Sequence, residues 1–161
     1  MKLDPIFEVK NNSLFLIADG SAVNPSSFSF VEFNQSDIEL DEEVYNEETL
    51  AAWREEFLVK AEKGEFVVFA PHASLDLTNA LNFERFCNTC NHTARRVKDC
   101  ISVAGFLFDE TFLSENAELR VADFIELLAK KHAQYVYFVQ KSVAEKLKIG
   151  DLLHKHAIVV Y

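Results

Sequence analysis

The sequence predicts an α/β fold, because strand-like and helix-like segments alternate along most of the chain. The alternation is clearest from Asn46 to Thr111, where a helical segment and an apolar strand follow each other twice. Residues 65–70 are almost continuously apolar, which is typical of strands covered on both faces and therefore of parallel sheets. Parallel strands need crossover connections, so this order predicts helices packed on a sheet. We expect one α/β domain over residues 1–161, a length that can bury a sizeable core.

Composition restricts the classes of partner. Acidic residues outnumber basic ones by 26 to 16, which gives a formal net charge of −10. That charge opposes binding to nucleic acid or to an anionic membrane, and no basic stretch with interleaved aromatic residues offsets it. No apolar run approaches the length of a membrane span. Three cysteines and the lack of a signal-like segment predict a cytoplasmic protein, and we expect no cofactor.

The N-terminal region predicts a β-hairpin. Residues 6–9 and 14–17 are rich in β-formers and flank a turn-forming cluster at 11–13. Loop residues follow at 19–20 and 24–27, and residues 28–33 alternate as a strand does.

An acidic segment at residues 37–48 then leads into the first long helix. Its carboxylates resemble part of a calcium loop, but the glycine of that loop is missing, so we expect no metal. The preferred interpretation is a solvated loop that precedes a helix N-terminus. The alternative is that this segment makes the protein an interaction module.

The later elements follow from periodicity and capping. Asn46 can cap a helix that ends at Gly64, and a second helix is predicted over 77–98. Ser114 can cap a third helix. Its apolar positions recur at helical spacing: Ala117, Val121, Phe124, Ile125 and Leu128. Strands at 101–108, 135–139 and 157–161 and a short helix at 142–148 complete the pattern.

Two groups of potential metal ligands are interpreted as structural. Cys87 and Cys90 form a C-x-x-C motif, but they share a helix face with phenylalanines while His92 points to the opposite side. We therefore expect buried core cysteines rather than a zinc or redox site. His154 and His156 alternate on a predicted strand and are expected at the surface.

The candidate site lies where two strands end. His72 follows the first apolar strand, and Asp109 and Glu110 follow the second. Ligands of α/β proteins bind at the carboxyl ends of parallel strands. A carboxylate held there can act as a general acid, although acidic residues also commonly begin loops and cap helices.

Two stretches resemble the cellulase-like (family 5) glycoside hydrolases. Residues 64–72, GEFVVFAPH, resemble the third-strand segment of that family, in which an aliphatic strand ends in a histidine. Residues 94–99 and 103–106 resemble its run into the fourth strand, which ends in Asn-Glu-Pro. The resemblance covers about residues 46–111 and implies that Glu110 is the acid/base, with Asp109 beside it, and that His72 binds substrate. Asp109 and Thr111 replace the asparagine and the proline.

The resemblance implies part of a barrel rather than a whole one. A complete (β/α)8 barrel takes about 250 residues, and about five strands follow the hairpin here. We therefore expect a partial, half TIM-barrel-like array, with an open doubly wound sheet as the alternative. In the family the second carboxylate of a retaining glycosidase lies on the seventh strand, and no later strand end here offers one.

Three functions follow from this arrangement. The first is a glycoside-hydrolase-like protein without standard hydrolysis, which retains carbohydrate binding or protein interaction. The second is a glycosidase assembled from two half barrels in a homodimer, with Glu110 as acid/base. The third is the interaction module built on the acidic segment 37–48. Open sheet edges favour association, so we expect a C2 dimer, which light scattering would detect.

Overall fold

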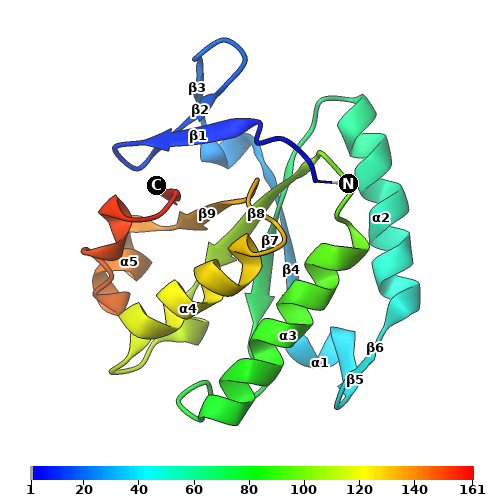
Figure 1. Ribbon diagram of the computed structural model, residues 1–161, viewed down its shortest axis with the longest axis vertical. Helices are drawn as coiled ribbons and strands as arrows, with labels where there is room; N and C mark the ends of the chain where they lie inside the picture. The colour runs from blue at the N-terminus through cyan, green and yellow to red at the C-terminus, as the bar shows by residue number, and fades with distance from the viewer. Residues whose placement is uncertain (1) are drawn as a thin grey trace.

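The fold is built on an open, five-stranded parallel sheet (Figure 1). The computed structural model describes residues 2–161. Across the sheet the strands are β4 (Ser29–Asn34), β7 (Val67–His72), β8 (Val103–Phe108), β9 (Val136–Val139) and β10 (Ile158–Val160). This spatial order is also the order along the chain, so each crossover places the next strand beside the last one.

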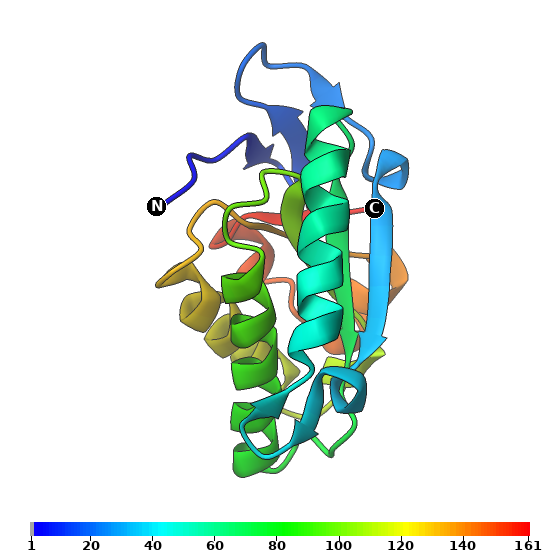
Figure 2. The same ribbon diagram turned by 90° about the vertical axis from the view of Figure 1, so that its right-hand side faces the viewer.

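The helices cover one face of this sheet. They are α1 (Gln35–Ile38), α2 (Glu47–Glu62), α3 (Ala80–Arg96), α4 (Ala117–Ala129) and α5 (Lys141–Leu147). Their buried side chains join one apolar cluster with alternate strand residues such as Phe69 and Phe106. Figure 2 shows α2 and α3 side by side over the sheet. The predicted α/β fold with a partial-barrel array is confirmed. The sheet is open, as the alternative expected, but a doubly wound sheet would carry helices on both faces.

The N-terminal segment covers part of the other face. The predicted hairpin is formed by β1 (Phe7–Lys10) and β2 (Ser13–Leu16), and β3 (Ala22–Val23) adds an unpredicted third strand. Phe7 and Leu14 pack against Phe28, Val68 and Phe138 in a second apolar cluster that contains no helix residue. Asn12, in the turn, donates hydrogen bonds through Nδ2 to the carbonyls of Leu153 (2.7 Å) and Ile158 (3.0 Å). The hairpin is therefore tied to the last strand of the sheet.

The sheet curls around this second cluster. A flat sheet would separate β4 and β10 by about 19 Å, because neighbouring strands lie about 4.8 Å apart. The rings of Phe30, on β4, and Tyr161, just after β10, nevertheless stack with centroids 6.0 Å apart. Figure 1 shows β9 crossing the direction of β4 and β7. The face opposite the helices is thus concave, as the inside of a barrel is, although the sheet does not close.

A β-bulge in β8 contributes to this shape. Val67 pairs with Val103, but the next residue of β7, Val68, pairs with Gly105, so Ala104 is an extra residue. Bulges bend a strand and increase its twist. At Gly105 the chain also comes very close to β9, since a Cβ atom there would lie 1.7 Å from the carbonyl oxygen of Val136.

Several boundaries differ from those predicted. β7 extends to His72 rather than ending at residue 70, and α3 is shorter at both ends than the predicted 77–98. α4 follows Asn116 rather than Ser114. The predicted strand around His154 and His156 is wrong: residues 152–154 form a short 3-10 helix, and β10 begins only at Ile158. The backbone N–H groups of residues 155 and 156 both donate hydrogen bonds to the carbonyl of Leu152, which favours this turn.

The acidic segment is more ordered than a solvated loop. It forms α1 and a small hairpin of β5 (Glu39–Asp41) and β6 (Val44–Tyr45) before α2 begins. Glu39 is buried and pairs with Arg85 of α3 at 2.7 Å. Glu47, in the first turn of α2, bonds to Arg96 at 2.6 Å. Glu39 thus joins β5 to α3, and Glu47 joins α2 to α3, so neither of these two carboxylates is free to contribute to an acidic docking surface.

Between residues 2 and 161, no helix combines the length and the apolar character that crossing a membrane requires.

Candidate functional site

Three neighbouring strands bring a histidine and two carboxylates together on the concave face. His72 is the last residue of β7, Asp109 follows β8, and Glu32 lies on β4. His72 Nδ1 is 2.5 Å from Asp109 Oδ2, and its Nε2 is 3.7 Å from Glu32 Oε1. The imidazole therefore lies between two carboxylates near the carboxyl ends of the strands.

Strand alternation explains why these side chains share a face. In β7, Val67 and Phe69 pack under the helices, whereas Val68 packs against the hairpin. Successive side chains of a strand point to opposite faces, so His72 lies on the same side as Val68. In β4 the buried Phe33 belongs to the helix side, which places Glu32 on the concave side.

The orientation of Asp109 is set by its own turn. Its Oδ1 accepts a hydrogen bond from the backbone N–H of Thr111 at 2.8 Å, at the start of the 3-10 helix Glu110–Phe112. The hydroxyl of Thr111 accepts from the N–H of Ala73 at 3.3 Å, which links this turn to the end of β7. Oδ2 is then directed to His72. A carboxylate at Nδ1 favours the tautomer that is protonated there, so Nε2 of neutral His72 can accept a proton or a hydrogen bond.

Glu110 does not join this group. Its Oε1 lies 2.5 Å from Nζ of Lys146 on α5, and both side chains are more than half exposed, at 55% and 56%. The structure thus brings His72 and Asp109 together but turns the carboxylate of Glu110 toward another helix. Glu32 was not predicted from the sequence as a site residue. The signal that could have found it is the alternation of residues 28–33, which puts Glu32 on the same face as Phe30.

The cysteines lie in the core, as predicted. Cys87, Cys90 and Cys100 are free thiols and are all buried. His92 is turned away from them; its ring stacks on Tyr45 with centroids 4.0 Å apart and its Nε2 contacts Glu47 at 2.7 Å. Within the described part of the chain, no three His, Cys, Asp or Glu side chains are grouped so that they could hold a metal ion.

Burial should make these thiols unreactive and the fold sensitive to alkali. Burial raises the pKa of Cys87 to about 12 and that of Cys100 to about 11. An unfolded chain loses these protons from a pH near 9, while the folded chain keeps them, so stability should fall as the pH rises above that value.

We expect iodoacetamide to alkylate the native protein far more slowly than the urea-unfolded protein at pH 8. Comparable rates would contradict the burial of the cysteines.

Comparisons with solved structures find a distant likeness in fold. No protein-family model matches the chain, and no curated protein matches it. Among solved structures, a GH5_18 from Bifidobacterium longum subsp. infantis is similar with a TM-score of 0.52 and 10% sequence identity. The similarity covers 68% of this chain and 33% of that one. The fold of this chain is distantly similar to that of this GH5_18 protein. The chain corresponds to about a third of the length of that protein, and at this identity the likeness concerns the fold alone.

Proposed function

We propose that this protein is a glycoside-hydrolase-like partial barrel that binds a carbohydrate on its concave face without standard retaining hydrolysis. The observation that carries the proposal is the placement of His72 between Asp109 and Glu32 near the carboxyl ends of three adjacent strands. This is the end of the sheet at which barrel proteins bind their ligands.

The chemistry of these groups suits sugar hydroxyls. A hydroxyl both donates and accepts hydrogen bonds, carboxylates accept them, and Nε2 of His72 can do either according to its protonation. The half-buried Phe30 and Tyr161 rings lie on the same concave side. Such rings offer an apolar surface to the C–H face of a sugar.

The same geometry argues against standard hydrolysis. A retaining glycosidase holds two carboxyl groups about 5–5.5 Å apart with the scissile bond between them. Here the imidazole of His72 occupies the space between Glu32 and Asp109. Glu110, the acid/base that the family resemblance implies, is paired with Lys146.

Carbohydrate binding can be tested on a glycan array, with NMR titration of any ligand found. We expect His72→Ala and Asp109→Asn to weaken binding by about 10-fold or more, since a hydrogen bond to a charged group contributes about 1.5–3 kcal/mol. Glu110→Gln is the matched control and should bind as the wild type does. Unchanged binding in both His72→Ala and Asp109→Asn would show that this site is not used.

Hydrolysis is tested separately with chromogenic aryl glycosides. We expect no turnover. Turnover that disappears in Glu110→Gln would instead favour the glycosidase assembled from two half barrels. Self-association through β4 or β10, on which that alternative depends, stays a prediction.

A further inference from the structure

A cavity of about 380 Å³ lies at the opposite end of the sheet from His72. Arg95 comes from the last turn of α3, and Lys98 lies just beyond that helix. Lys131 and His132 follow α4, and Lys2 and Gln134 complete the polar part of the wall. These segments lead into the amino ends of β8 and β9. The cavity is therefore separate from the candidate carbohydrate site.

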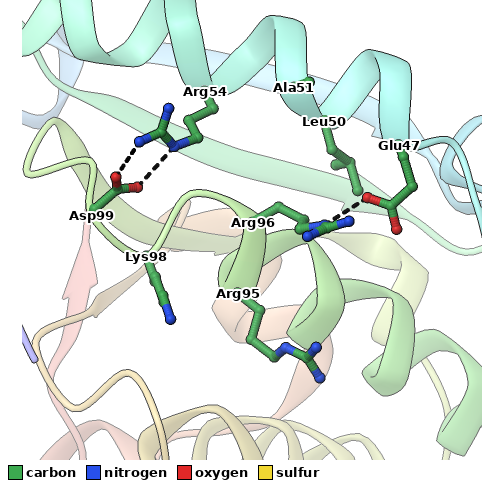
Figure 3. A pocket seen from close by; sticks show the side chains of 8 residues that line it. All are labelled: Glu47, Leu50, Ala51, Arg54, Arg95, Arg96, Lys98 and Asp99. Carbon is green, nitrogen blue, oxygen red and sulfur yellow. Dashed lines mark hydrogen bonds and ion pairs between the residues drawn. The ribbon is translucent and has the colours of Figure 1, made fainter. Parts of the chain in front are cut away.

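The cavity is strongly basic in a protein whose net charge is −10. A neighbouring groove between α2 and α3 shares Arg95 and Lys98, but its other two arginines are neutralised. Arg54 pairs with Asp99, and Arg96 pairs with Glu47. Figure 3 shows Arg95 and Lys98 pointing away from α2 instead. Over residues 2–161, neither these two side chains nor Lys131 forms an ion pair with a carboxylate.

His132 provides a second and independent observation. Its side chain lines the cavity, the residue is only 3% exposed, and its Nε2 is buried without a hydrogen-bond partner among residues 2–161. Buried polar atoms almost always have a partner, so an orphaned one needs an explanation. A tight turn holds the residue in place, because its N–H donates to the carbonyl of Leu128 at 2.8 Å. The ring also stacks on Tyr135 with centroids 5.3 Å apart.

The charges around His132 favour an anion in this cavity. Burial and the nearby charges of Lys98 and Arg95 lower the pKa of His132. The imidazole is therefore neutral at physiological pH and can still donate or accept one hydrogen bond. An anion placed among the three cations would offset the repulsion that they exert on each other.

We infer that this cavity binds phosphate, either as the phosphate group of a small ester or as the free ion. A phosphate dianion matches several unpaired cations better than a singly charged carboxylate does. The guanidinium of Arg95 can bind two phosphate oxygens at once, and the ammonium groups of Lys98 and Lys131 act as point charges. The volume suits a small molecule, since ligand pockets usually measure about 300–1,000 Å³.

The test titrates the full chain at low salt with inorganic phosphate and with phenyl phosphate, a simple phosphate ester. Binding is followed by NMR through the amide and imidazole resonances of His132. We expect saturable binding with a dissociation constant of about 1 mM or lower. The double variant Arg95→Gln/Lys98→Gln should bind at least about 10-fold more weakly, because two charge-assisted contacts are lost.

Two matched controls define the result. Lys155→Gln removes an exposed cation outside the cavity, and His72→Ala alters only the opposite end of the sheet; both should bind phosphate as the wild type does. Tighter binding of phenyl phosphate would identify a phosphate ester as the ligand, and tighter binding of inorganic phosphate would identify the free ion. Absence of saturable binding, or equal affinity in the double variant, would overturn the inference. Neither result depends on whether the protein binds carbohydrate.

Discussion

Replacing Gly105 with alanine is expected to destabilise the fold by at least about 3 kcal/mol, the upper part of the range for overpacked cores. The new Cβ would lie 1.7 Å from the carbonyl oxygen of Val136 and 2.8 Å from its carbonyl carbon. Both are backbone atoms of the adjacent strand, which is held by pairing on either side. Neither strand can move away without breaking the β8–β9 ladder in the centre of the sheet.

The measurement is urea-induced unfolding followed by circular dichroism. Gly150→Ala is the matched control, because a Cβ there meets nothing within 4 Å. That variant should unfold within about 0.5 kcal/mol of the wild type, as surface substitutions commonly do. Similar unfolding curves for Gly105→Ala and Gly150→Ala would mean that β8 and β9 do not approach each other as described.

Removing the guanidinium of Arg85 is expected to destabilise the protein by about 2–3 kcal/mol, because the buried carboxylate of Glu39 then loses its charged partner. The side chain of Glu39 is only 4% exposed and lies 2.7 Å from Arg85 Nη2. Its remaining donors are neutral: Gln35 Nε2 at 2.9 Å and the hydroxyl of Thr89 at 3.0 Å. The expected loss is below that of a fully buried pair, because the Arg85 side chain is 38% exposed and water can reach it.

A double-mutant cycle measures the interaction energy of the Glu39–Arg85 pair apart from the other contacts of the two residues. Glu39→Gln removes the charge and keeps most of the shape, so Arg85→Ala/Glu39→Gln should be more stable than Arg85→Ala alone. Arg96→Ala breaks the exposed pair with Glu47 and should cost less than about 1 kcal/mol. Equal losses for Arg85→Ala and Arg96→Ala would contradict the burial of Glu39.

Local patterns were sufficient to predict the main helices and the strands of the parallel sheet, but not the short elements β3, α1, β5 and β6, nor the polar contacts. The continuous apolar run of β7 and the apolar stripe of α4 depend on neighbours along the chain, and both predictions were confirmed. The burial of Glu39 depends on Arg85, which lies 46 positions further along. Nothing near Glu39 in the sequence distinguishes it from the other acidic residues of its segment.

The candidate site likewise combines positions that the sequence predicts with contacts that it does not predict. His72 and Asp109 could be expected to lie close together, because neighbouring parallel strands end at one edge of a sheet. The direction of Glu110 could not be expected in this way. Asp109 caps its own short turn, and the turn directs Glu110 to Lys146, a contact that spans 36 positions. Glu32 was missed because its role depends on β4 lying beside β7, which the order of residues does not specify.

The hairpin that covers the concave face has a consequence for how the chain acquires its structure. Its turn residue Asn12 contacts Leu153 and Ile158, at sequence separations of 141 and 146. Tyr161 likewise stacks on Phe30. Contacts between such distant positions slow folding, because a long loop must close before they form. Phe7 and Phe28 therefore cannot complete their packing before β9 and β10, which carry Phe138 and Val159, have been synthesised. An aromatic cluster that must wait for β9 and β10 in this way is prone to aggregation while its packing is incomplete.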